Sequence, residues 1–277
     1  MLDPSAIQAG ARGLYYAATM LLFGDLAFSL LIRAKLPIIP PPRDMRIRWS
    51  ALALAGAAAL AWLITAVVGM AGTFDQQAVT ATVTQTLFGQ LFLVRILALA
   101  AMTLVLRRGA MPAALLALAA LALPAATSHA AAASPAGFAA LGASLDAVHL
   151  LTAGFWIGGL AVLLQLYRRK EPNILLALSL FSEWAMIAVL LLVMTGLINA
   201  ASILLGDKGA ASPVYLAVLG VKLALVAGML GLAAMNRFRL MPQNRNQEIA
   251  RNAAMELSAG VIVVLLAGAL GQLQPTL

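Results

Sequence analysis

Long apolar runs alternate with short polar connections along the whole chain. A helix needs roughly 20 mainly apolar residues to cross about 30 Å of hydrocarbon, and eight segments of the sequence meet that requirement. Polar residues do not recur at every second position inside these segments, as they would in barrel strands. The pattern therefore predicts an all-α, polytopic membrane helix bundle with eight transmembrane helices. They cover residues 13–33, 49–71, 86–106, 110–128, 141–167, 173–203, 213–236 and 252–272.

The first apolar segment is expected to remain as a helix. It is too long for the apolar core of a typical signal peptide, and no small-residue cleavage site precedes "IRAKLP". The polar connections, such as "GTFDQQAVTATVTQT" and "SHAAAASPAG", are too short to hold a soluble domain. Residues 1–277 are therefore interpreted as a single integral membrane domain.

Basic residues define the orientation of the bundle. Fourteen of the 18 Lys and Arg residues lie in the connections after the first, third, fifth and seventh predicted helices. Cytoplasmic loops of membrane proteins carry such an excess, so these connections are predicted to be cytoplasmic and both termini periplasmic. The net charge of +8 is then a sign of topology. A nucleic-acid partner is not expected, because the connections are too short to build a basic soluble face.

Composition limits the chemistry that the bundle can perform. Hydrophobic residues make up 63% of the chain and charged residues 10%, which excludes an ordinary water-soluble domain. There is no cysteine, so disulfides and thiolate metal sites are absent. A soft metal would have to be bound by imidazole and thioether groups, for which the chain has two His and 12 Met.

Both histidines are predicted at the outer level of the membrane. At about 1.5 Å per residue, His149 and His129 lie about 28 and 31 Å from the basic ends of their helices. Met70 and Met194 lie about 33 and 36 Å from theirs by the same rise. Two imidazoles and up to two thioethers are therefore candidate ligands of one metal ion at the outer mouth of the bundle.

The stretch "SLDAVHLLTAGFWIGGLAVLL" adds a carboxylate to this level. Asp146 precedes His149 by almost one helical turn on the same face, so it is predicted to orient the imidazole or to bind the metal directly. Gly154 and Gly158, with Gly159 beside them, form a surface of small residues that another helix can approach closely. The helix is therefore expected to form an inner wall of the bundle.

Four further charges fall inside predicted helices, namely Arg95, Glu183, Lys222 and Glu256. Such charges are costly in a membrane and are expected to pair or to line a wet cavity. Glu183 and Lys222 share a similar depth, which predicts an ion pair, with a proton or cation relay as the alternative. Glu256 lies closer to its basic boundary, where the interface would hydrate it. Asp25 belongs to the same class.

The second half of the sequence resembles the copper resistance protein D family of bacterial inner-membrane proteins. The resemblance is strongest over 141–277 and covers the first half loosely, including "SHA" at 128–130. It rests on "LDAVHLLTAGFWIGGL", "LFSEWAMIAVLLLVMTGLINA", "VKLALVAGMLGLAAMNRFRLMP" and "NAAMELSAGVIVVLLAGALGQLQP". It implies a non-enzymatic protein that takes copper across the inner membrane toward the cytoplasm, often beside a periplasmic copper-binding partner. The family's outer histidines correspond here to His129 and His149.

Two other functions remain open from the residues. The two histidines would also suit axial ligation of one haem in a membrane redox protein. A third interpretation is a membrane partner that docks a periplasmic copper chaperone without conducting the ion. No GxxxxGK[ST] loop is present for an ATP-driven pump. The ligand types leave Cu(I) and Cu(II) undecided.

Overall fold

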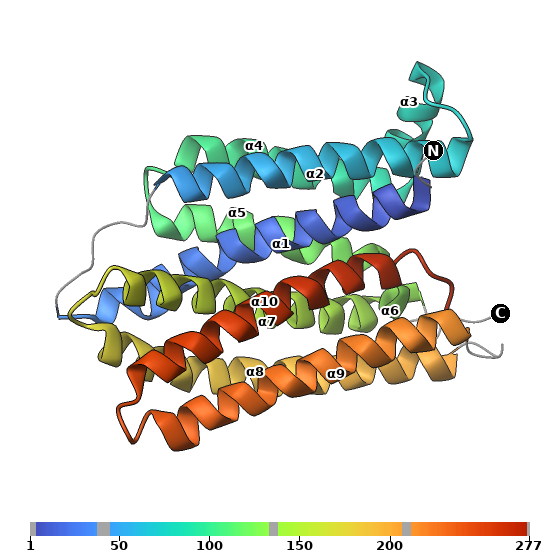
Figure 1. The fold of residues 1–277 in the computed structure, drawn as a ribbon. Helices are drawn as coiled ribbons and strands as arrows, with labels where there is room; N and C mark the ends of the chain where they lie inside the picture. The colour runs from blue at the N-terminus through green and yellow to red at the C-terminus, as the bar shows by residue number, and fades with distance from the viewer. Residues whose placement is uncertain (1–3, 38–44, 133–137, 207–211, 276–277) are drawn as a thin grey trace.

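The computed structural model describes residues 4–37, 45–132, 138–206 and 212–275 (Figure 1). Within these residues every regular element is helical. The α-helices are α1 (Pro4–Leu31), α2 (Met45–Ala71), α3 (Gln76–Gln85), α4 (Leu87–Val105), α5 (Ala110–Ala122), α6 (His129–Ala132), α7 (Ala139–Arg168), α8 (Ile174–Gly206), α9 (Pro213–Met235) and α10 (Asn246–Leu270). Short 3-10 turns, η1 (Arg33–Lys35) and η2 (Leu123–Thr127), follow α1 and α5, and a π-helical turn, η3 (Asn236–Leu240), follows α9.

Eight of the helical segments are long and apolar enough to cross a membrane, which confirms the predicted all-α membrane bundle. Their boundaries agree with the prediction to within four residues except at two ends. The first span already begins at Ser5, and the last begins at Asn246 rather than at 252. The additional turns lie beyond the apolar runs, so a search for apolar length alone does not find them.

The polar connection after α2 contains a short helix that the search for long apolar segments does not predict. Helix α3 begins after Asp75, whose side chain accepts a hydrogen bond from the backbone N–H of Ala78 at 2.8 Å. This bond, together with one from the Thr73 hydroxyl, lowers the pKa of Asp75. The capping interaction stabilises the first turn of a helix that has little apolar surface of its own.

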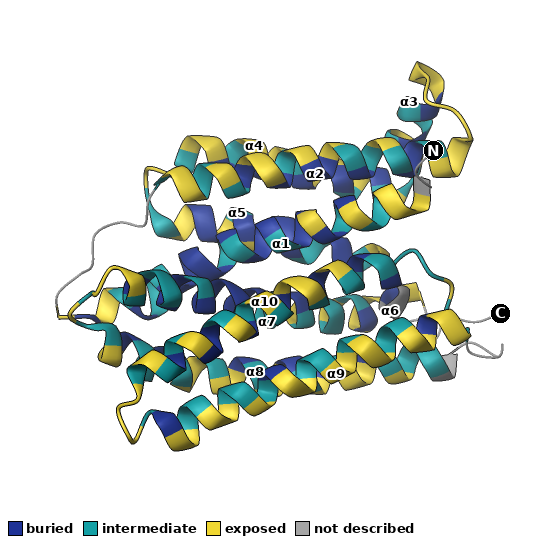
Figure 2. Cartoon of the chain, viewed as in Figure 1, coloured by how far each residue is buried: buried dark blue, intermediate teal, exposed yellow. Residues whose placement is uncertain are grey.

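Helix α1 is the central element of the bundle. It packs against α2 and α5 on one side and against α7 and α10 on the other. In the most apolar stretch of α1, 67% of the residues are buried, against 6% for α9. Helix α9 packs chiefly on α10 and lies at the edge of the bundle, where Figure 2 shows largely exposed residues.

Glycines bring α1 and α7 into close contact. A Cβ atom on Gly24 of α1 would lie 2.4 Å from the carbonyl oxygen of Gly154 and 2.5 Å from the Cα atom of Gly158. A Cβ atom on Gly159 would lie 2.1 Å from the ring of Phe181 on α8. The predicted close approach on this surface is therefore confirmed, and α7 lies between α1 and α8.

The connections rich in basic residues gather at one end of the bundle. The α7–α8 and η3–α10 connections lie at this end, and the start of α1 and the end of α10 lie at the opposite end (Figure 1). We call the first of these the basic end. Which compartment the basic end faces stays a prediction.

Candidate functional site

His149 is held against α8 by its ring nitrogen Nδ1. Nδ1 lies 3.1 Å from the carbonyl oxygen of Leu192 and 3.2 Å from the hydroxyl of Thr195. The Thr195 hydroxyl donates to the carbonyl of Leu191 at 2.7 Å. Because a carbonyl can only accept, this network assigns the proton to Nδ1. Nε2, which has no hydrogen-bond partner among the described residues, then carries the free lone pair.

The imidazole fits against α8 because residue 196 is glycine. A Cβ atom at Gly196 would lie 3.0 Å from Cε1 of His149 and 3.4 Å from Nδ1. Any side chain at this position would therefore press on the ring. The absence of a side chain at Gly196 and the carbonyl of Leu192 together fix the orientation of the imidazole.

Asp146 lies almost one turn from His149 and interacts with polar residues from three other segments of the chain. The amide of Asn199 on α8 donates to its Oδ1 at 3.2 Å. The hydroxyl of Ser128, just before α6, also hydrogen-bonds to it. Lys222 of α9 interacts electrostatically with both Asp146 and His149. We call Ser128, Asp146, His149, Thr195, Asn199 and Lys222 the α7–α8 polar cluster.

The other predicted metal ligands are placed differently. His129 is the first residue of α6, and its side chain lies outside the described residues. Its neighbour Ser128 contacts Asp146, so the start of α6 lies beside the cluster. Met70 and Met194 are 57% and 52% exposed. Met70 is the last residue but one of helix α2, which packs on α1, α3 and α4.

The structure therefore brings His149 and Asp146 together but leaves both methionine side chains at the surface. Among the described residues, no group of three or more His, Cys, Asp or Glu side chains has the arrangement of a metal site. The binding of copper by the five predicted ligands stays a prediction.

The predicted Glu183–Lys222 ion pair is wrong. Glu183 is exposed on α8, and no ion pair joins these two side chains in the described part of the chain. Lys222 interacts with Asp146 instead. Equal depth along two helices does not place two side chains on facing sides, and α9 packs on α10 rather than on α8.

Two of the other intramembrane charges have structural partners. Asp25 of α1 accepts from Nε of Arg48 on α2 at 2.6 Å, in a pair that is almost fully buried. Arg95 is 1% exposed and lies among aromatic rings, with its guanidinium 4.7 Å from the ring centres of both Trp62 and Phe92. Neither a carboxylate nor a wet cavity was needed, because aromatic faces attract a desolvated cation.

Glu256 is 1% exposed, so its predicted hydration at the interface is wrong. Its carboxylate accepts from the amide of Asn236 at 2.9 Å and from the indole N–H of Trp156. The amide of Asn252 donates to Oδ1 of Asn236 at 2.8 Å. The spacing of four residues between Asn252 and Glu256, which places them on one helical face, was a signal for this network.

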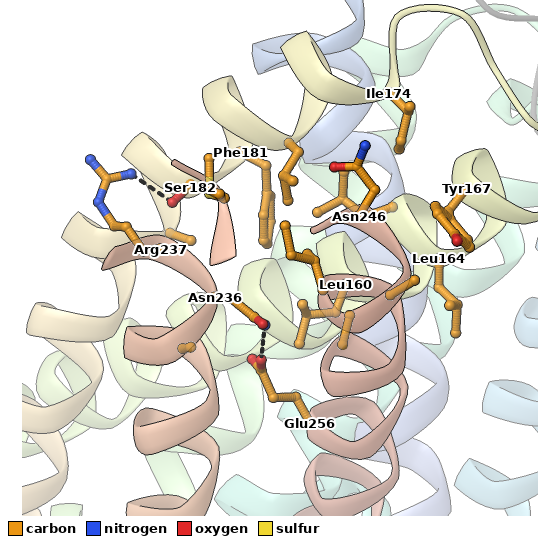
Figure 3. A pocket seen from close by; sticks show the side chains of 18 of the residues that line it. Leu160, Leu164, Tyr167, Ile174, Phe181, Ser182, Asn236, Arg237, Asn246 and Glu256 are labelled. Carbon is orange, nitrogen blue, oxygen red and sulfur yellow. Dashed lines mark hydrogen bonds between the residues drawn. The ribbon is translucent and has the colours of Figure 1, made fainter. Parts of the chain in front are cut away.

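A pocket with an empty volume of about 730 Å³ lies between α7, α8, η3 and α10, with Glu256 in its wall (Figure 3). The pocket lining as a whole is mostly apolar, and Leu160, Leu164 and Phe181 are among the side chains that form it. Arg237 also lines it and donates to the hydroxyl of Ser182 at 2.6 Å. The pocket and the α7–α8 polar cluster lie toward opposite ends of α7.

The fold and these two polar sites define a polytopic helical membrane protein with ionisable groups inside the bundle. Residues 175–270 match the family model for copper resistance protein D, and residues 1–138 match the model for the copper resistance protein D-like N-terminal domain. The chain belongs to the copper resistance protein D family.

Two curated relatives share part of the chain. The copper transport protein CutJ of Bacillus subtilis (strain 168) is 32% identical over 132 residues, which cover 46% of this chain and 24% of that protein. Copper resistance protein D of Pseudomonas syringae pv. tomato is 33% identical over 152 residues, covering 48% of this chain and 49% of that protein. The matched regions thus span half or less of these relatives. No solved structure matches the chain.

Proposed function

We propose that this protein binds copper at the α7–α8 polar cluster and moves it across the bacterial inner membrane toward the cytoplasm. The observation that carries the proposal is the hydrogen bond from Nδ1 of His149 to the carbonyl of Leu192. Metal-binding histidines commonly donate their second ring N–H in this way, which fixes the tautomer and directs the other nitrogen at the metal. The names of the two relatives, which concern copper transport and resistance, support copper as the cargo.

We assign His149 as the first ligand through Nε2. Asp146, one turn away, orients the site or supplies a carboxylate oxygen. His129 begins the segment that lies beside Asp146, which supports it as a second imidazole ligand. We leave Met70 and Met194 out of the proposed site, because their side chains are more than half exposed.

The charge distribution supports a direction for the path. The basic end is assigned to the cytoplasm by the positive-inside rule, so the α7–α8 polar cluster faces the periplasm. We further propose that a periplasmic copper-binding protein delivers the ion there. We also propose that residues 1–277 form one membrane unit, since α1 packs against helices of both matched regions, and that this unit is not an enzyme.

Copper binding and uptake test the proposal together. Full-length protein in lipid nanodiscs would be titrated with Cu(I) and with Cu(II), and uptake measured in vesicles that contain the same variants. His149→Ala should abolish tight binding and uptake, while Val148→Ala, a neighbouring exposed position, should keep both. An absorption spectrum tests the haem alternative in the same sample, because a bound haem gives a Soret band. Unchanged copper binding in a folded His149→Ala variant would overturn the proposal.

A further inference from the structure

The pocket beside Glu256 extends toward the basic end of the bundle. Its wall includes Tyr167 and Ile174, next to the α7–α8 connection, and Asn246, at the start of α10 (Figure 3). Glu256 lies more than two turns further along α10. The pocket therefore extends from the buried carboxyl group of Glu256 toward the basic end of the bundle.

The hydrogen bonds around Glu256 are all donated toward its carboxyl group, from Asn252 to Asn236 and from Asn236 to Glu256. A carboxylate oxygen can only accept, so the amide nitrogen of Asn236 must donate to it. The amide oxygen of Asn236 then accepts from Asn252. The amide oxygen of Asn252 is buried and has no hydrogen-bond partner among the described residues. The Glu256 carboxyl group is thus the last acceptor in a series of hydrogen bonds, and the groups that donate these bonds are neutral amides.

No charged partner neutralises Glu256 within the described part of the chain. The other titratable groups in the pocket wall are Tyr167 of α7 and Arg237 of η3, and Arg237 donates to Ser182. On the other helices packed against α10, Asp25 of α1 is paired with Arg48. Lys222 of α9 interacts with Asp146. A buried carboxylate without a cation is costly, so the site requires either a proton or a bound cation.

The geometry favours the proton. A metal ion would need several ligand atoms with lone pairs directed at it. The groups that contact the Glu256 carboxylate, Asn236 and Trp156, instead direct N–H bonds at it. The carboxyl group lies among apolar side chains and in the wall of an empty pocket, so a proton can reach it from the basic end through that pocket.

We propose that Glu256 is a proton-binding site that is loaded and unloaded from the basic end through this pocket. The site lies apart from the α7–α8 polar cluster and does not depend on copper binding there. It gives the protein a group at which proton exchange can accompany the movement of a cation.

Infrared difference spectroscopy between acidic and alkaline buffer tests the proposal on the full-length protein in nanodiscs. A protonated carboxyl group gives a C=O stretching band that shifts in D₂O. The component of this band that comes from Glu256 should be present in the parent, absent in Glu256→Gln, and retained in Glu248→Gln. Glu248 is a matched control because it lies on the same helix but is partly exposed and paired with Arg245.

Two variants that keep Glu256 provide independent readouts. Asn236→Ala removes one donor and should move the band to higher frequency. Ala250→Phe, which fills part of the pocket, should slow hydrogen–deuterium exchange of the band. Identical difference spectra for the parent and a folded Glu256→Gln variant would overturn the proposal. If Glu256→Gln does not fold, a band that neither Asn236→Ala nor Ala250→Phe alters would overturn it as well.

Discussion

Nδ1 of His149 lies 3.1 Å from the carbonyl oxygen of Leu192. Together with the contact between Nδ1 and the Thr195 hydroxyl, it joins α7 to α8 inside the bundle. It also determines which ring nitrogen remains available for a ligand. The same hydrogen bond therefore has a structural role and a role in the proposed copper site.

Gly196 provides a test that leaves every proposed ligand in place. Gly196→Val should displace the imidazole, because a Cβ atom there would lie 3.0 Å from Cε1 of His149. We expect copper affinity to fall about 10–100-fold, as for other changes that disturb the orientation of a ligand. Gly220→Val on α9 is the control, since no atom lies within 4 Å of its added Cβ. Equal copper affinities of the two variants would contradict the assigned geometry.

Lys222 should oppose copper binding by its positive charge. It interacts with both Asp146 and His149, so Lys222→Met removes a competing cation and releases Asp146. We expect roughly tenfold tighter binding of Cu(I), equivalent to about 1.4 kcal/mol. Lys222→Arg keeps the charge and should bind as the parent does. Titration of both variants in nanodiscs decides the point, and weaker binding by Lys222→Met would mean that the lysine supports the site.

The membrane helices could be predicted from the sequence, but contacts within the site could only be predicted in part. Apolar length determines that a segment spans the membrane, and periodicity along one helix placed Asp146 beside His149. Depth does not determine which side of a helix faces a neighbour. Met194 and Glu183 have suitable depths, yet both lie exposed on α8. The partners of Lys222 and Arg95 depend on helix packing across the bundle, which no local pattern encodes.

Reporter fusions test the orientation on which the direction of transport depends. A fusion after Leu277 should report a periplasmic location, and a fusion at Asn244, in the η3–α10 connection, should report a cytoplasmic one. We expect this result because basic residues are concentrated around the η3–α10 connection, and such residues are enriched on the cytoplasmic side of a membrane. Alkaline phosphatase activity measures the first location and fluorescence of a cytoplasmic reporter the second. The reverse pattern would place the α7–α8 polar cluster on the cytoplasmic side.

The Asp25–Arg48 pair should stabilise the contact between α1 and α2 far more than a surface pair would. The side chains are 4% and 11% exposed, so replacing either partner breaks an ion pair inside the bundle. We expect Asp25→Asn or Arg48→Met alone to lower the free energy of unfolding by about 3–5 kcal/mol.

The double variant should lose less than the two single losses added together, because both single changes break the same pair. Glu248→Gln, which breaks the partly exposed pair with Arg245, should cost only about 0.2–1 kcal/mol. Unfolding of the purified proteins in mixed micelles with increasing denaturing detergent gives all four values. Additive losses in the Asp25 and Arg48 variants would show that the two side chains act independently. In that case, the hydrogen bond between Arg48 and Ser29 would be the next contact to test at this junction.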